Sequence, residues 1–173
     1  RTAVFAGGGT GGHLFPSLAI AERLAERADA PAVHFVCSNK PLDAEILRKA
    51  EMAFTPVPVR GLSSNPLHWP GFAYRLIKSV QVSRLTLAVR EAGVVVAMGG
   101  YVSAPVVAAA RRLHLPVMLV NLDAVAGRAN RRVARRADEI FSVYESPGLG
   151  RPSRSVAFPI RRAALGSVES AEA

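Results

Sequence analysis

The sequence predicts an α/β fold, a Rossmann-like parallel sheet with helices on both faces. Short β-branched apolar runs alternate with longer amphipathic stretches along the 173 residues. The strand-like runs are apolar throughout, as expected where both faces of a parallel sheet are covered. Half of the residues are hydrophobic, and this length suits one domain with its own core.

The predicted elements follow one another in strict alternation. Strands are expected at Thr2–Ala6, Val33–Ser38, Thr55–Val59, Val94–Met98, Val117–Leu122 and Glu139–Val143. Helices are expected at Pro16–Ala28, Leu42–Ala50, Phe72–Glu91, Pro105–Leu113 and Ala126–Arg136. In the first helix, apolar residues recur at three- and four-residue steps. Segments Gly61–Gly71 and Ser146–Ser155, rich in Gly, Pro and Ser, are expected to be mobile loops.

The composition narrows the classes of partner. The net charge of +9, from 22 basic and 13 acidic side chains, implies an anionic partner such as phosphate or acidic lipid. Nucleic acid is not expected, because no stretch interleaves aromatic with basic residues. Cys37 stands alone, which excludes an internal disulfide and favours a reducing, cytoplasmic setting. No apolar run approaches the length of about 20 residues of a membrane-spanning helix, and the first residues do not resemble a secretion signal.

A glycine loop, Gly7-Gly8-Gly9-Thr10-Gly11-Gly12-His13, joins the first strand to the first helix. Its free N–H groups and the positive end of the helix would form an anion site. The loop lacks the Lys-Ser/Thr pair of a P-loop. It does not fit a dinucleotide site cleanly either, since no acidic residue ends the second strand. A tight turn that needs small residues is the alternative.

A second glycine loop, Met98-Gly99-Gly100-Tyr101-Val102-Ser103-Ala104-Pro105, follows the fourth predicted strand. Pro105 suits a helix start and Ser103 an N-cap. Two such junctions on neighbouring strands would converge on one anion, for which a diphosphate has the natural size. The candidate diphosphate-binding residues are Gly8, Gly9, Thr10, Gly11, Gly12, Gly99, Gly100, Tyr101 and Ser103.

These two loops resemble the paired glycine loops of the MurG-type family, the peptidoglycan N-acetylglucosaminyltransferases. The match continues through Phe15-Pro16, Leu115-Pro116-Val117, Ala126-Gly127, Asn130-Arg131 and Phe158-Pro159-Ile160-Arg161, over essentially the whole chain. The resemblance implies one half of a GT-B glycosyltransferase that inverts the anomeric carbon. Residues 1–162 would be the N-terminal acceptor-binding domain. Residues 163–173 would be a linker or tail toward a missing C-terminal donor-binding domain, without which the chain should be inactive.

The resemblance also implies the partners. The acceptor would be an undecaprenyl-diphosphate-linked sugar like lipid I, and UDP-GlcNAc would bind through the missing domain. The protein would act in peptidoglycan synthesis, and thereby in cell shape and division, without a cofactor. It would lie peripherally on the anionic cytoplasmic face of the bacterial inner membrane.

His13 is the first candidate for the catalytic base, because it sits at the junction of loop and helix and histidine commonly exchanges protons near neutral pH; the alternative is that it only hydrogen-bonds phosphate or sugar. Where the family carries His-Glu-Gln-Asn, this chain has Val120-Asn121-Leu122-Asp123, which puts the acceptor in question. Asp123 is a weaker candidate base, or it caps the following helix. The resemblance places Asn121, Asn130 and Arg161 in the acceptor cleft and requires no metal.

A membrane-contact surface is expected around the third helix. Bulky apolar and basic residues stand together there, and the candidates are Leu67, Trp69, Phe72, Arg75 and Lys78. The alternative for the helical part is an ordinary core helix with a wet basic side. Five arginines, Arg128, Arg131, Arg132, Arg135 and Arg136, recur at helical spacing and favour attraction to lipid headgroups over a merely solvated face.

Three other readings remain open at this point. The chain could be a non-catalytic acceptor-binding, membrane-recruiting subunit of a split glycosyltransferase. It could be a related transferase with another lipid acceptor. A nucleotide-binding oxidoreductase domain is the third, and it would have to bind NAD(P).

Overall fold

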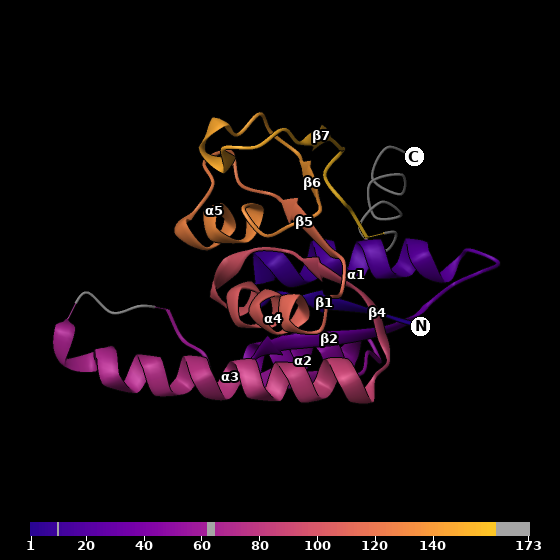
Figure 1. Cartoon of the computed structure of the whole chain (residues 1–173). Helices are drawn as coiled ribbons and strands as arrows, with labels where there is room; N and C mark the ends of the chain where they lie inside the picture. The colour runs from indigo at the N-terminus through magenta and orange to yellow at the C-terminus, as the bar shows by residue number, and fades with distance from the viewer. Residues whose placement is uncertain (10, 62–64, 162–173) are drawn as a thin grey trace, which may run out of the picture.

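The computed structural model describes residues 1–9, 11–61 and 65–161 and confirms the predicted Rossmann-like fold. Seven parallel strands form one sheet in the order β3-β2-β1-β4-β5-β6-β7, with helices on both sides (Figure 1). The strands are β1 (Thr2–Ala6), β2 (Ala32–Ser38), β3 (Phe54–Val57), β4 (Ala92–Ala97), β5 (Val117–Asn121), β6 (Glu139–Ser142) and β7 (Arg154–Ser155). The α-helices are α1 (Gly11–Ala25), α2 (Pro41–Lys49), α3 (Trp69–Val89), α4 (Gly100–Arg112) and α5 (Arg128–Ala134).

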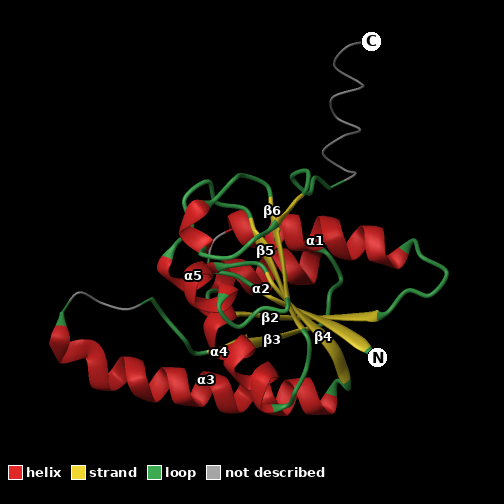
Figure 2. Ribbon diagram, turned by 45° about the horizontal axis from the view of Figure 1, so that its top comes forward, coloured by secondary structure: helices red, strands yellow, loops and turns green. Residues whose placement is uncertain are grey.

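Helices lie on both sides of the sheet (Figure 2), and the core consists of two apolar layers, one on each face of the sheet. Alternate residues of β1 point to opposite faces, so Phe5 packs with α1 and α2 while Val4 packs with α3, α4 and α5. Phe5 and Phe35 stack with ring centroids 5.4 Å apart. Burial on both faces explains why the strands are apolar throughout.

The topology brings the two glycine loops together. From β1 the sheet continues to β2 on one side and to β4 on the other, with Ala6 in register with Ala97. The carboxyl ends of β1 and β4 are therefore adjacent, and the chain leaves them in different directions. Such a switch point is where open α/β sheets bind ligands.

Both helices that follow the glycine loops begin earlier than predicted. They start at Gly11 and Gly100, whereas the sequence placed their starts at Pro16 and Pro105. Pro16 and Pro105 each stand inside their helix, at its sixth residue, where the proline ring removes the hydrogen bond to the carbonyl four residues earlier and crowds that carbonyl. The loops are therefore shorter, and the N-terminal turn of each helix contains residues of the glycine motif.

Helices α1 and α5 also end earlier than predicted, at Ala25 and Ala134, and α5 starts at Arg128 instead of Ala126. Further differences lie in segments predicted to be mobile loops. Trp69–Gly71 belong to α3, preceded by a 3₁₀ turn at Pro66–His68. The segment after β6 contains a 3₁₀ turn, Pro147–Leu149, and the short strand β7. Residues 62–64 and the predicted tail 163–173 lie outside the described residues, so the boundary at residue 162 remains a prediction.

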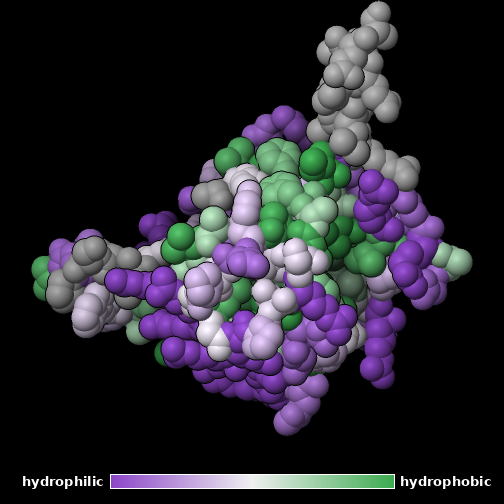
Figure 3. Space-filling model, turned by 90° about the horizontal axis from the view of Figure 1, so that it is seen from above, coloured by the Kyte–Doolittle hydropathy of each residue, from purple (hydrophilic) through white to green (hydrophobic). Residues whose placement is uncertain are grey.

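Two features of the surface are the projecting end of α3 and a group of hydrophobic residues on one side of the domain. The N-terminal end of α3 extends past the other elements (Figures 1 and 2). Seen from above, the side on which β6 and β7 lie, hydrophobic groups gather in the middle of the surface with hydrophilic groups around them (Figure 3). Exposed apolar side chains from this end of the chain include Tyr144, Phe158 and Ile160.

Candidate functional site

The two glycine turns meet at the side chain of His13, in the first turn of α1. A Cβ added to Gly99 would lie 3.3 Å from His13 Cε1, and one on Gly100 would lie 3.2 Å from His13 Cδ2. Both positions also have positive φ, +97° and +73°, which only glycine adopts readily. The predicted convergence of the two turns is confirmed, and glycine is needed there so that the imidazole can approach the backbone.

Tyr101 makes the reciprocal contact, from α4 to the first glycine turn. A Cβ on Gly9 would come within 2.7 Å of the Tyr101 ring, and the φ of Gly9 is +88°. Each turn therefore receives one ring from the other. The inner part of the junction is therefore filled by the protein's own side chains.

Gly9 is held by the turn between β2 and α2, which contains none of the predicted site residues. Its N–H donates to Asp43 Oδ2 at 2.7 Å, and its carbonyl accepts from Lys40 Nζ at 2.6 Å. Asp43 is completely buried and also accepts from Ser38 N and from Ser38 Oγ. The expectation that the first loop offers free N–H groups is therefore wrong for Gly9. No acidic residue ends β2, but a carboxylate in the first turn of α2 reaches back to that position.

Ser103 belongs to the framework of the second turn. It is fully buried, and its Oγ donates to the carbonyls of Ala6 and Gly99, both at 2.8 Å, and accepts from Gly99 N at 3.1 Å. The N-cap of α4 is Gly99, so the prediction of Ser103 as N-cap is wrong. Because Ser103 is buried in these bonds, its predicted contact with a diphosphate is not supported either.

The groups open to a ligand lie at the outer ends of the two turns. Gly8, Gly9 and Gly99 are buried, whereas Gly12 is exposed and Gly11, Gly100 and Tyr101 are partly exposed. The first N–H groups of a helix have no intrahelical acceptor. Those of α1 and α4 lie side by side here, at the positive ends of both helices. Thr10, also predicted for this site, lies outside the described residues.

His13 has one ring nitrogen inside the protein. Among the described side chains, its Nδ1 is buried without a hydrogen-bond partner. The ring is otherwise held by contacts with Gly99 and Gly100, and the residue as a whole is only partly buried. The packing fixes the orientation of the imidazole. Because Nδ1 is buried, Nε2 is the ring nitrogen that remains for a hydrogen bond or a proton transfer with a ligand.

A polar network after β5 adjoins the same junction. Asn130 Nδ2 donates to Asn121 Oδ1 at 2.8 Å and to Asp123 Oδ2 at 3.3 Å, while Asn121 Nδ2 donates to Ser142 Oγ at 3.0 Å. Asn130 Oδ1 lies 2.9 Å from the Cβ position of Gly99, which ties the network to the second glycine turn. Asp123 does not cap the next helix, because α5 starts at Arg128 with Gly127 as N-cap. The cap interpretation was wrong, and the carboxylate is oriented by Asn130.

Arg161 lies elsewhere on the domain. Its guanidinium forms an ion pair with Glu22 of α1 at 2.6 Å. Glu22 follows His13 by about 13 Å along the helix axis. Arg161 thus fastens the last described residues to α1, and the structure does not bring it together with His13 and Asn130.

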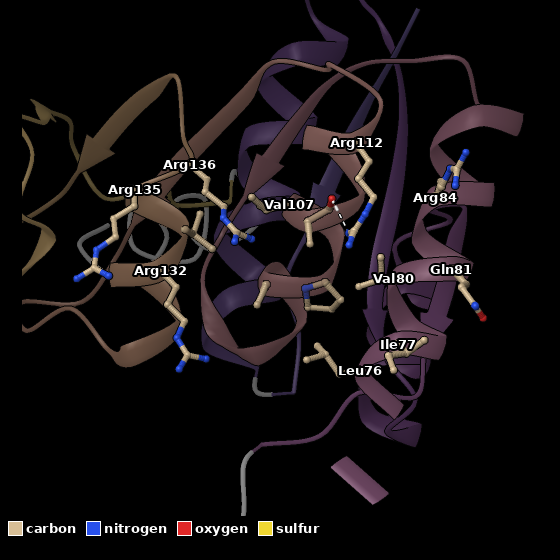
Figure 4. Close-up of a pocket in the computed structure, with 14 residues that line it drawn as sticks. Leu76, Ile77, Val80, Gln81, Arg84, Val107, Arg112, Arg132, Arg135 and Arg136 are labelled. Carbon is tan, nitrogen blue, oxygen red and sulfur yellow. Dashed lines mark hydrogen bonds between the residues drawn. The ribbon is translucent and has the colours of Figure 1, made fainter. Parts of the chain in front are cut away.

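A separate groove of about 740 Å³ lies between α3, α4 and α5 (Figure 4). Leu76, Ile77 and Val80 of α3 line it on one side, and Arg132 of α5 with Arg135 and Arg136 just after that helix on the other. Arg84 and Arg112 add two further guanidinium groups, of which Arg112 donates to the carbonyl of Ala108 at 3.2 Å. An apolar floor with a basic rim suits contact with the anionic surface of a lipid layer.

The predicted membrane-contact residues lie on and before the projecting end of α3. Leu67, Phe72 and Arg75 line a second groove of about 460 Å³, together with Arg60 and His68. Leu67 is 85% exposed and Trp69 52% exposed, and Lys78 is also exposed. Trp69 starts α3 rather than lying in a loop. Within the described ranges, no helix combines the length and apolar character needed to span a bilayer.

Two further titratable side chains are buried in β2. Burial, and secondarily the Asp43 carboxylate, raises the pKa of the Cys37 thiol to about 12, so it carries no thiolate at neutral pH. Burial, and secondarily Arg90, lowers the pKa of His34 to about 4. Over the described part of the chain, no three His, Cys, Asp or Glu side chains cluster as metal ligands would.

Comparison with known proteins agrees with this arrangement. Residues 3–142 match the family described as the glycosyltransferase family 28 N-terminal domain. Two curated relatives named UDP-N-acetylglucosamine--N-acetylmuramyl-(pentapeptide) pyrophosphoryl-undecaprenol N-acetylglucosamine transferase come from Leuconostoc citreum and Geotalea daltonii. The first is 35% identical over 154 residues, covering 88% of this chain and 42% of its own. The second is 37% identical over 145 residues, covering 83% and 40%.

Solved structures share the fold. The crystal structure of Acinetobacter baumannii MurG superposes with a TM-score of 0.73 at 24% identity, over 91% of this chain and 44% of that one. A UDP-N-acetylglucosamine 2-epimerase superposes with a TM-score of 0.63 at 11% identity, over 82% and 41%. The chain therefore spans less than half of the length of each of these proteins.

Proposed function

The chain belongs to glycosyltransferase family 28, as an N-terminal domain, and from this premise we propose that it binds the acceptor of a sugar transfer. The acceptor is a diphosphate-linked lipid, and the sugar is GlcNAc carried by UDP, as in the names of the curated relatives. The observation that carries the proposal is the meeting of the two glycine turns at His13. Two helix N-termini side by side provide N–H donors and positive potential for the two phosphates of one diphosphate.

The proposed reaction is a single displacement with inversion. The acceptor hydroxyl oxygen bonds to the anomeric carbon of GlcNAc while the bond from that carbon to the UDP oxygen breaks. UDP leaves with the electron pair, and the hydroxyl proton passes to Nε2 of His13. Nδ1 would then carry the ring's own proton. In the alternative role, His13 hydrogen-bonds the acceptor and Asp123, oriented by Asn130, takes the proton.

We further propose that α3 and the arginine groove hold the domain against anionic lipid at the cytoplasmic membrane surface. The exposed Leu67 and Trp69 provide apolar contact, and the basic rim of the groove provides electrostatic attraction. A lipid-linked acceptor presents its diphosphate at that surface, so peripheral docking would deliver it to the glycine turns.

Binding of soluble analogues tests the proposed function. In isothermal titration calorimetry, the chain should bind farnesyl diphosphate about ten-fold more tightly than farnesyl phosphate, because a second phosphate engages the second helix. NAD should not compete. Equal affinity for the two farnesyl ligands, or tighter binding of NAD, would contradict the proposal.

A further inference from the structure

The turn after β2 encloses Gly9 from two sides with opposite charges. The Asp43 carboxylate accepts the Gly9 N–H at 2.7 Å, and the Lys40 ammonium donates to the Gly9 carbonyl at 2.6 Å. Both side chains come from a segment of only four residues at the start of α2. The two polar groups of Gly9 are therefore occupied by groups that carry full charges.

The carboxylate works against an anion at this position. Asp43 is 0% exposed, so water does not screen its charge, and its Oδ2 lies so close to Gly8 that a Cβ there would clash with it. Like charges at such short range disfavour binding strongly in a low-dielectric interior. An anion held by the first helix end needs a positive group close by to offset this carboxylate.

Lys40 is placed to supply that group. Its residue is exposed, and among the described residues its ammonium has one acceptor, the Gly9 carbonyl. An ammonium has three donors, so two remain for a ligand. The first N–H groups of α1, at Gly11 and Gly12, follow Gly9 by two and three residues and are accessible.

A second feature of the junction indicates that a ligand belongs there. Asn130 is 2% exposed, and its Oδ1 has no hydrogen-bond partner among the described residues. This oxygen lies 2.9 Å from the Cβ position of Gly99, in the second turn. Leaving a buried acceptor unpaired is costly unless a donor reaches it. A diphosphate carries no donor, so this oxygen would be served by a hydroxyl of the sugar beside the diphosphate.

We propose that Lys40 is a diphosphate-binding residue of the glycine-turn site. Its ammonium contacts the phosphate at the α1 end and offsets the buried Asp43 carboxylate, in the way that a P-loop lysine serves a P-loop, but from the following βα junction. The proposal rests on the proposed function, and names the residue that favours a diphosphate over a monophosphate.

The experiment titrates farnesyl diphosphate, farnesyl phosphate and UDP into the chain and three variants. Lys40→Met removes the charge, Lys40→Arg retains it, and Lys49→Met is the matched control at the other end of α2, where the lysine pairs with Glu45 at 2.7 Å. Lys40→Met should weaken the binding of farnesyl diphosphate about ten-fold. Its binding should also become less dependent on salt. Lys40→Arg and Lys49→Met should stay close to the unmodified chain.

The outcomes separate the two proposals. If the unmodified chain does not bind farnesyl diphosphate, the proposed function fails. If it binds and Lys40→Met binds equally well, only the role of Lys40 is overturned. If Lys40→Met weakened the binding of farnesyl diphosphate and farnesyl phosphate equally, Lys40 would only stabilise the turn. That result would also overturn the proposed role of Lys40. Weakening confined to UDP would assign the lysine to the donor's diphosphate and contradict the acceptor site.

Discussion

In the glycine turns, the inner backbone groups are fixed by neighbouring side chains, and in the arginine groove the charged ends lie in solvent. Asp43 and Lys40 hold Gly9, and Ser103 holds Gly99, all through bonds of 3.1 Å or less. Arg132, Arg135 and Arg136 are exposed around an apolar floor. Both regions are proposed to meet anions, but only the first has fixed donor positions. The difference teaches that the turns suit one ligand of defined geometry, whereas the groove suits a surface of variable composition.

The largest effect is expected at His13. His13→Ala should lower transferase turnover by about 10²–10⁴-fold, the usual contribution of a general base. The assay follows release of UDP from UDP-GlcNAc by the chain working with a donor-binding domain. His114→Ala is the control, because His114 is exposed and lies between α4 and β5. It is therefore at the amino ends of the strands, whereas the glycine turns lie at the carboxyl ends. Near-normal turnover of His13→Ala would remove this residue from the mechanism.

The fixed geometry of the turns should also show in stability. Gly99→Ala should lower the free energy of unfolding by about 2–4 kcal/mol, because it introduces a side chain at positive φ beside Asn130. Urea denaturation measures the change. Gly71→Ala is the matched control, since a Cβ there meets no atom within 4 Å. Similar stability of the two variants would show that the second turn is less constrained than the distances indicate.

Binding of the arginine groove to lipid vesicles should depend on the charge of its arginine side chains. The double variant Arg132→Gln/Arg135→Gln should bind vesicles of anionic lipid about 10–30-fold more weakly, since each arginine near the surface contributes about 1 kcal/mol. Sedimentation at two salt concentrations measures this. The variant Arg23→Gln/Arg27→Gln on and just after α1 changes the net charge equally and should bind normally. If both variants lose binding alike, the attraction depends on net charge and not on the groove.

The smallest effect concerns acid stability away from both regions. The pKa of His34 is about 4 in the folded state and about 6.5 when unfolded, so the unfolded state binds the proton more readily between these values. Stability should be complete above pH 6.5 and fall by about 2 kcal/mol as the pH decreases toward 4. Thermal unfolding of His34→Gln should lack most of this decrease. An unchanged pH profile in that variant would assign the effect to other groups.

Much of the fold followed from the sequence because its signals are local. The apolar runs of β1 and β5 and the glycines after β1 and β4 predict a parallel sheet with a switch point, and the structure has them there. The predicted starts of α1 and α4 are wrong, because Pro16 and Pro105 lie inside the helices, where a proline is disfavoured and the sequence therefore gives no sign of it.

The site was less predictable because its key contacts join distant segments. Glycine spacing shows that a side chain is absent, but not which group fills the space, as with Tyr101 over Gly9. Asp43 lies 34 residues from Gly9, and no spacing rule connects the two. Serine is a residue type favoured at N-caps, yet Ser103 is buried and its hydroxyl donates to the carbonyl of Ala6, 97 residues away.

The central claim is that the outer ends of both glycine turns hold one diphosphate together. Proton–nitrogen correlation spectra of the ¹⁵N-labelled chain, titrated with farnesyl diphosphate, test it most directly. The account predicts that the amide signals of Gly12 and Gly100 shift along the same saturation curve, while those of Arg132 and Arg135 stay in place. Shifts at only one of the two glycines, or shifts confined to α5, would contradict it.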